Sequence, residues 1–556
     1  MILYFEGYKY KMRHIENILD DSLYDYIPEK DELYIPYVGY YYSTLAEDSV
    51  FILPKVFLHN HLAFGLYDPT TIIKVDDDNS QLDEDGIKAT IFSLSVWVYR
   101  AIAQFVQRNL GSTITKDANI QNVVSYDGTS SQTFLDVILA LLKFHKEHRN
   151  LFTYIAIINS SGQNKIHWAK TISKTQPILQ NGDPYYMTFH NKNKVVNFDE
   201  EIIILFYSVL NYLRETMHFR VKSDVNYNLI PSRKIASMIV NGKGTRLLKS
   251  IRRKYFTDEL IKLWNLLYVF FDMAEQIKSN RYSGDRLLAK SFNVVFEDMI
   301  DYLIGGTKDL PKELHDQEDG KIVDHLFKDR SLFDNSDIYY IGDSKYYRDD
   351  NDLGKNSIYK QFTYAKNVIQ YNIDIALGSR KPGKFAMVKY RDELTEGYNV
   401  TPNFFIRGFV DMGNISYSDD QLSPIFNKEI RENKHFENRL FDRDTLLLKE
   451  YNINFLFVLA AYVSQSEDEN YKKTIRKKFR DGLIQMIKAK YRLFKVTPHN
   501  GDIEEFVNSH FRKYIGKMYH SDKADYIWMA FDKKSDVNAF LNEISITASY
   551  EEFNLQ

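Results

Sequence analysis

The spacing of apolar residues changes along the chain and predicts a β-rich start followed by helices. Residues 37–42 and 50–55 are runs of aromatic and β-branched residues joined by a polar stretch, which is typical of two strands. Apolar side chains then recur every three or four positions, which predicts helices at 87–106, 134–145, 200–216 and 257–278. The acidic run from Asp76 to Gly86 separates the two patterns and indicates a solvated loop.

In the second half of the chain, patterns of both kinds alternate. Residues 291–303 carry apolar positions at helical spacing, with Glu297 on the flank of the apolar stripe. Residues 321–327 and 337–347 are rich in β-branched and aromatic residues and predict two strands. The remaining elements are a helix at 358–369 and strands at 384–390 and 404–412.

The composition excludes several kinds of chemistry. The chain of 556 residues has no cysteine, which excludes disulfides, cysteine-ligated zinc, iron–sulfur clusters and thiol catalysis. Its 72 Lys and Arg against 75 Asp and Glu leave a net charge of −3, so a polyanion site must be a local patch. The longest apolar runs fall short of the ~18 residues of a membrane helix. Because no secretory signal is visible either, we expect a soluble cytoplasmic protein without membrane contact.

Positive charge gathers in two stretches. Residues 232–254 contain eight basic residues and no acid, and residues 471–492 contain nine basic residues against Asp481 alone. Such stretches are candidates for contact with a phosphate backbone, although a solvated helix face gives the same pattern. The candidate DNA-binding residues are Arg246, Lys249, Arg252, Arg253, Lys254, Lys473, Arg476 and Lys477.

Between the basic stretches, acidic residues fall on apolar elements. Asp343 and Lys345 are two positions apart on a predicted strand, so their side chains share one face. If the strand at 321–327 pairs with this one, Asp324 converges on the same point, and Glu297 supplies a third acid. Three gathered carboxylates repel one another unless a cation is present. Mg²⁺ is the usual cation where phosphate is the substrate, and Lys345 beside it would orient or deprotonate a water.

An acid-x-Lys triplet is common by itself. It recurs at 319–321, 432–434 and 532–534, each time in polar or turn-like surroundings, where it marks a surface strand or loop. The triplet at Asp343 differs because it ends an apolar strand, follows two acid-bearing elements and precedes a helix with Lys360 and Gln361. We therefore interpret it as the centre of a nuclease.

The order of these residues resembles the PD-(D/E)xK nuclease superfamily: Glu297 on a helix, Asp324 on a strand, Asp343-x-Lys345, then a helix with Gln361 and Tyr364. More narrowly, the chain is similar to the LlaJI-type restriction endonucleases, which are akin to the McrC nuclease subunits. Further matches span most of the chain, at 37–39, 51–57, 162–172, 406–409, 454–462 and 510–517. Two positions depart from the superfamily pattern, since Val323 replaces the usual proline and Asp343 the commoner glutamate.

The resemblance implies an α/β (α+β) multi-domain fold in which helices flank a mixed β-sheet. It also implies a restriction endonuclease in phage defence that cuts double-stranded DNA with Mg²⁺, or with Mn²⁺ as a substitute. Glu297, Asp324 and Asp343 would be the metal-side acids, Lys345 the catalytic lysine and Gln361 a helix residue facing the site. The four expected regions are a β-rich then helical N-terminal domain for DNA recognition or assembly (1–150), a basic helical region (151–285), the nuclease core (286–465) and a basic helical C-terminal region (466–556).

The partners of such a protein follow from what the sequence lacks. It has neither a P-loop nor a dinucleotide fingerprint, so any nucleotide-driven step needs a separate AAA+ GTPase or other NTPase subunit. Cutting both strands takes two centres or two visits, which favours a homo-oligomer. Two alternatives stay open: a repair or recombination nuclease with the same core, and a non-catalytic DNA-binding subunit of a McrBC-like complex.

Overall fold

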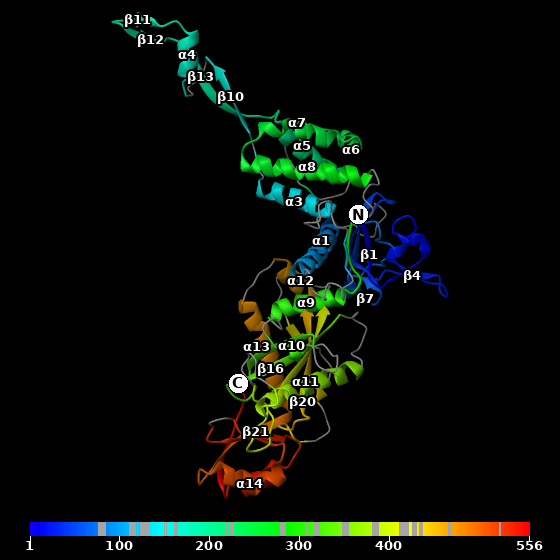
Figure 1. Cartoon of the computed structure of the whole chain (residues 1–556), viewed down its shortest axis with the longest axis vertical. Helices are drawn as coiled ribbons and strands as arrows, with labels where there is room; N and C mark the ends of the chain where they lie inside the picture. The colour runs from blue at the N-terminus through cyan, green and yellow to red at the C-terminus, as the bar shows by residue number, and fades with distance from the viewer. Residues whose placement is uncertain are drawn as a thin grey trace.

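The computed structural model describes most of the chain, in blocks separated by gaps. The described residues are 1–75, 85–109, 118, 120–122, 133–148, 151, 153–160, 165–216, 221, 227–278, 285–305, 310, 312–315, 323–346, 355–380, 388–410, 422–424, 431–432, 438–464, 469–521 and 524–555. Most of the predicted acidic loop, at 76–84, and residues 384–387 of a predicted strand lie outside this set. The molecule is elongated, with the C-terminal domain at one end and a narrow arm at the other (Figure 1).

The N-terminal domain is built on a five-stranded sheet. Its strands, in spatial order, are β1 (Ile2–Phe5), β6 (Asp48–Leu53), β5 (Val38–Ser43), β14 (Arg286–Ala289) and β9 (Ile120–Asn122). β5 and β6 pair antiparallel, which confirms the two strands predicted at 37–42 and 50–55. β14 comes from far along the sequence and pairs with both β5 and β9. The predicted boundary at residue 286 is the first residue of β14, so it assigns a strand of the N-terminal sheet to the predicted nuclease core.

Smaller elements surround this sheet. The long helix α1 (Asp85–Arg108) contacts β5, β6 and β14. The others are β2 (Lys9–Tyr10), η1 (Met12–His14), η2 (Asp21–Leu23), β3 (Asp25–Ile27), β4 (Glu32–Tyr34), η3 (Lys55–Phe57), β7 (Leu58–His59) and β8 (Leu62–Ala63).

A helical region follows the N-terminal sheet. It comprises α3 (Phe134–Glu147), α5 (Glu201–Thr216), α6 (Ser232–Val240), α7 (Lys243–Ile251), η4 (Arg252–Lys254) and α8 (Asp258–Lys278). Of these, α3, α5 and α8 confirm the helices predicted at 134–145, 200–216 and 257–278, whereas α6 and α7 fall in the first basic stretch and were not predicted. The N-terminus of α3 has a capping box, in which Thr133 and Asp136 bond each other's backbone N–H.

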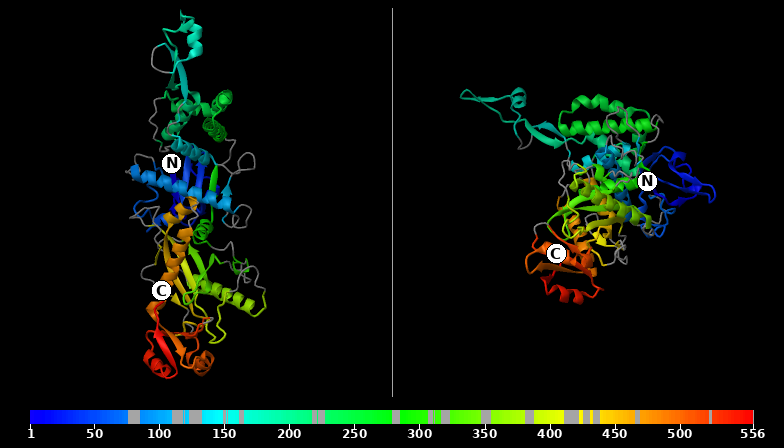
Figure 2. Two further views of the ribbon diagram at one scale, coloured as in Figure 1. Left: turned by 90° about the vertical axis from the view of Figure 1, so that its left-hand side faces the viewer. Right: turned by 60° about the horizontal axis from the view of Figure 1, so that its bottom comes forward.

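An arm projects from this helical region in both views of Figure 2. It consists of the hairpin β10 (Tyr154–Asn159) and β13 (Asn191–Val196), the helix α4 (Trp168–Lys174) and the hairpin β11 (Ile178–Gln180) and β12 (Asp183–Tyr185). Few side chains of the arm are buried among the residues that the structure describes there, 153–160 and 165–197.

The central domain is a six-stranded mixed sheet flanked by helices. Its strands are β15 (His325–Arg330), β16 (Asp337–Lys345), β17 (Thr401–Phe409), β20 (Leu446–Asn454), β18 (Leu422–Pro424) and β19 (Arg431–Glu432). β15 and β16 pair antiparallel, whereas β16, β17 and β20 run parallel. The parallel strands are buried on both faces, which explains the nearly unbroken apolar run in β16.

The flanking helices are α9 (Phe292–Ile304), α10 (Lys312–His315), α11 (Lys355–Ala376), α12 (Phe455–Ser464) and α13 (Glu469–Lys490). One apolar core continues from the N-terminal domain into this one; for example, the rings of Phe57 and Phe455 lie 5.7 Å apart. The fold is thus mixed α/β and multi-domain, as predicted.

The C-terminal residues differ from the predicted helical region. After α13 they form a four-stranded sheet of β22 (Met518–Tyr519), β23 (Ile527–Asp532), β21 (Tyr491–Pro498) and β24 (Ala548–Glu552), with α14 (Ile503–Tyr514) and α15 (Val537–Ile544). Buried positions alternate along much of β21, and this period of two overrides the basic composition on which the prediction rested. In the described residues, no helix has the length and apolar content needed to cross a membrane.

Candidate active site

Asp343 and Lys345 lie at the end of β16, between β15 and β17. Their side chains share a face of the strand, as predicted, and form a direct ion pair. The Asp343 side chain is 4% exposed and that of Lys345 13%, so the pair is largely removed from water. The residue before Asp343 is Gly342. Only glycine fits at this position, because a Cβ there would lie 2.2 Å from the Phe404 ring.

Asp324 reaches the same place from the neighbouring strand. It stands directly before β15, where His325 pairs with Gly342, so the strand begins later than predicted. Its Oδ2 accepts a hydrogen bond of 3.3 Å from the Ser344 backbone N–H. Burial raises its pKa well above the usual range, the carboxylates of Asp343 and Glu297 raise it further, and Lys345 opposes the shift.

Glu297 joins these groups from α9. Burial is the largest cause that raises its pKa, and the charges of Asp343 and Asp301 add to the shift, while His325 and Asn293 oppose it. The helix α9, the residue before β15 and the end of β16 thus bring Glu297 and Lys345 into electrostatic interaction with Asp324 and Asp343. Like charges in a desolvated place disfavour full ionisation, which is the electrostatic condition expected where a cation is to bind.

Gln361 lies on α11 and is buried against the sheet. Its Nε2 donates to the Ile341 carbonyl at 2.9 Å and to Asn403 Oδ1 at 3.2 Å, so the amide ties the helix to β16 and β17. Its Oε1 has no hydrogen-bond partner within the described part of the chain. Tyr364, one turn along the helix, is fully buried, and burial raises its pKa. Through these hydrogen bonds, Gln361 holds β16 in place.

Sequence reasoning missed a buried dyad beside these acids. His325, the residue after Asp324, is fully buried, and its Nδ1 lies 2.7 Å from Asp301 Oδ1 on α9. Its Nε2 is also buried and without a hydrogen-bond partner among the described residues. The sequence did contain a signal for this dyad, because a histidine directly follows a candidate acid in a predicted apolar strand.

The three acids offer the donor atoms that a divalent metal ion needs. Carboxylate oxygens are the ligands that Mg²⁺ and Mn²⁺ take, so the chemistry of Glu297, Asp324 and Asp343 fits. However, no group of three or more acidic or histidine side chains in the described ranges is already arranged to hold an ion. In this arrangement the ammonium of Lys345 neutralises Asp343. The metal site therefore stays a prediction.

The candidate DNA-binding residues of the first stretch lie on α7 and η4. Figure 1 shows α7 beside the base of the arm. Arg246, Lys249 and Arg253 are exposed. Arg252 stacks over Trp264, with 5.1 Å between its guanidinium carbon and the ring centre, and Lys254 pairs with Glu201 at 2.5 Å. A positive surface is therefore present on this helix pair.

The second stretch follows α13 beside the central sheet. Lys473 and Lys477 are exposed and available to a phosphate backbone. Arg476 is not, because its guanidinium donates to the Ile304 carbonyl at 2.7 Å and lies over the Phe327 ring. That residue closes the C-terminal end of α9 and holds α13 against it.

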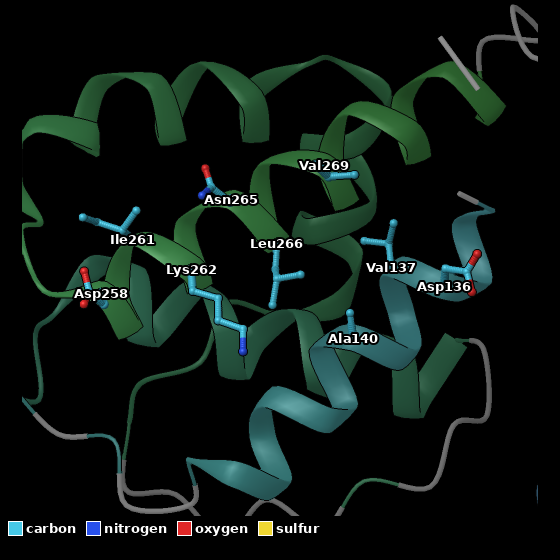
Figure 3. A pocket seen from close by; sticks show the side chains of 9 residues that line it. All are labelled: Asp136, Val137, Ala140, Asp258, Ile261, Lys262, Asn265, Leu266 and Val269. Carbon is cyan, nitrogen blue, oxygen red and sulfur yellow. The ribbon is translucent and has the colours of Figure 1, made fainter. Parts of the chain in front are cut away.

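A pocket of about 400 Å³ lies between α3 and α8 (Figure 3). Its charged side chains are Asp136, Asp258 and Lys262, and apolar residues make up most of the remaining wall. Asp136 already serves the capping box of α3. This pocket belongs to the helical region and holds none of the predicted site residues.

Comparison with known proteins gives only distant likeness to solved structures. No protein-family model and no curated protein matches the sequence. Among solved structures, the chain is similar to one in a Thermococcus gammatolerans assembly of McrB AAA+ hexamers with bound McrC. The TM-score is 0.28 at 12% identity, over 86% of this chain and 99% of that one. A likeness of this size assigns neither the fold nor an activity.

Proposed function

We propose that the chain is a Mg²⁺-dependent nuclease that hydrolyses phosphodiester bonds of double-stranded DNA, as a restriction endonuclease in phage defence. The observation that carries the proposal is the electrostatic coupling of Asp324 to Asp343, Glu297 and Lys345, with Asp343 and Lys345 paired directly. Acids whose pKa is shifted by burial together with specific charged neighbours are typical of functional sites.

The roles of the residues follow from their positions. Asp343, Asp324 and Glu297 would hold the ion, which on binding supplies charge stabilisation at the phosphate and lowers the pKa of a water. The ammonium of Lys345, which pairs with Asp343, would stabilise charge on the phosphate oxygens. Gln361 fixes β16 through the Ile341 carbonyl and so keeps Asp343 and Lys345 in register.

The direct test incubates the purified chain with plasmid DNA and Mg²⁺ or Mn²⁺, and with EDTA as the control. Each reaction is run with and without candidate NTPase subunits, and the ends are mapped. Cleavage that requires the divalent ion supports the proposal, and its absence under every condition contradicts it. Methylated and unmethylated plasmids separate a restriction enzyme from a repair or recombination nuclease, because only the former discriminates between them.

The arm favours a second role, assembly with another protein. It exposes large apolar side chains, among them Leu179 at 72% and Met187 at 76%, together with Tyr154, Ile155, Ile157, Trp168, Ile172, Ile178 and Tyr185. Surfaces of this kind mark protein–protein contacts. We propose that the arm binds a separate AAA+ GTPase or other NTPase subunit, in a complex of the McrBC kind.

This second role has its own test. Leu179→Asp with Met187→Asp would prevent association with the NTPase subunit in size-exclusion chromatography with light scattering, while DNA binding is kept. The same measurement gives the oligomeric state of the chain alone, for which we propose a homo-oligomer. If Lys345→Ala leaves cleavage by the assembled complex unchanged, the chain is a non-catalytic subunit.

A further inference from the structure

The residue after Lys345 is held by another domain. Tyr346 is 5% exposed, and its hydroxyl donates a hydrogen bond to Glu6 Oε2, 340 positions away in the sequence. Glu6 directly follows β1 of the N-terminal sheet and is itself only 8% exposed. The bond therefore joins the end of the strand that carries Asp343 and Lys345 to the N-terminal domain.

Lys55 closes the same contact from a second N-terminal segment. Its backbone N–H lies 3.2 Å from both Glu6 Oε2 and the Tyr346 hydroxyl. Its Nζ lies 3.8 Å from Glu6 Oε1 and 4.5 Å from the centre of the Tyr346 ring. A buried carboxylate needs donors to offset its desolvation, and here an N–H, an ammonium and the Tyr346 hydroxyl supply them.

The other side of the Tyr346 ring faces α9. Its centre lies 5.4 Å from that of Phe292 and 6.0 Å from that of Phe296, the residue before Glu297. One side chain thus touches the helix that carries Glu297, adjoins Lys345 in the chain and is bonded to the N-terminal domain.

We propose that Glu6, Lys55 and Tyr346 form an interdomain clamp that positions Lys345 and Glu297 for catalysis. All three are positioning residues, because they act through their neighbours. The N-terminal domain is then part of the nuclease machinery, and a partner that shifts it relative to the central sheet changes cleavage without touching the acids. This inference rests on the proposed nuclease function. Displacements of about 1 Å at a reacting group can cost about 10²-fold in rate, so the loss of a single bond is measurable.

The first test compares Tyr346→Phe, Glu6→Gln and the double variant in steady-state DNA cleavage. Each single variant should lower kcat about tenfold and leave KM within about twofold, because positioning is impaired and the DNA-binding surface is kept. The double variant should fall no further than the less active single variant, since both substitutions remove one shared bond. Tyr340→Phe is the matched control. It removes the hydroxyl of a tyrosine within β16, and that hydroxyl donates to the carbonyl of Arg330, the last residue of β15. Its kcat should stay unchanged.

A second measurement does not depend on nuclease activity. The rate at which an amine-reactive reagent labels Lys345 is followed by mass spectrometry in the full-length folded variants. Because the strand end is released, labelling should be at least about threefold faster in Tyr346→Phe than in the wild type or Tyr340→Phe. Unchanged labelling together with unchanged kcat overturns the clamp. If the wild type cuts no DNA, the proposed function fails, and the labelling rate alone decides the clamp.

Discussion

Two acidic sites in this molecule share a pKa raised by burial and differ in their neighbours. Asp285, just before β14, is 2% exposed, and burial raises its pKa to about 7. Its carboxylate accepts hydrogen bonds of 3.2 and 3.1 Å from the Phe134 backbone N–H at the start of α3. Asp324 is half-buried, and burial is again the largest cause that raises its pKa, but its neighbours are Asp343, Glu297 and Lys345.

The difference separates an anchor from a candidate centre. Burial raises the pKa in both places, so a raised pKa by itself marks neither as functional. Asp285 has donors around it and fastens α3 to the N-terminal sheet. Around Asp324 the neighbours are further acids and an ammonium, which is the arrangement that a cation and a phosphate would complete. Substitutions at the two sites should therefore have different consequences.

The largest effect is expected at the end of β16. Asp343→Ala and Lys345→Ala should each lower Mg²⁺-dependent cleavage by about 10³-fold or more. The first removes a proposed ligand of the ion, and the second removes the ammonium that would stabilise charge at the phosphate. Circular dichroism and thermal melting should show that both variants fold. Asp285→Asn is the matched control, since it neutralises a buried acid elsewhere and should keep full cleavage. Cleavage that survives both substitutions would mean that the centre lies elsewhere.

A smaller effect is expected from Glu297, which lies on the adjacent helix. Glu297→Gln should lower cleavage about 10- to 100-fold and raise the Mg²⁺ concentration needed for half-maximal rate, because the variant has one charged oxygen donor fewer. The measurement is the rate as a function of Mg²⁺ concentration. An unchanged Mg²⁺ midpoint would remove Glu297 from the set of metal-side acids.

Asp285 should control stability and leave cleavage alone. Its pKa of about 7 in the folded state lies above the ~3.9 of an unfolded aspartate, so the folded state binds more protons between these values. The free energy of unfolding therefore falls as pH rises from about 4 to about 7. Asp285→Asn should remove this contribution, so its stability relative to the wild type increases over that range and levels off above it. Urea denaturation at several pH values measures the difference, and a pH-independent difference would contradict the assignment.

The smallest effects concern the basic surfaces. Arg253→Glu and Lys477→Glu should weaken DNA binding and flatten its salt dependence by about one unit of slope for each phosphate that is no longer neutralised. Lys9→Glu on the N-terminal domain, where Lys9 pairs with Glu32, is the control. An unchanged slope in Arg253→Glu or Lys477→Glu would show that the stretch concerned is an ordinary solvated surface.

The local elements and one short part of the site could be predicted from the sequence alone. Apolar spacing located β5, β6, β16 and the helices α1, α3, α5, α8, α9 and α11, because side chains on a helix or strand repeat with a fixed local period. The same period placed Asp343 and Lys345 on one face, and the structure shows them paired. These results depend only on residues close together in the chain.

The contacts between residues that are distant in the sequence could be identified only from the folded chain. In the folded chain β14 joins the N-terminal sheet, and the Arg476 guanidinium donates to the Ile304 carbonyl at the end of α9. His325 pairs with Asp301, and Tyr346 bonds to Glu6. The C-terminal sheet was missed because its basic surface positions hid the alternation beneath them. Strand pairing and burial set these contacts, and both depend on the free energy of packing the whole chain, which no local period of the sequence encodes.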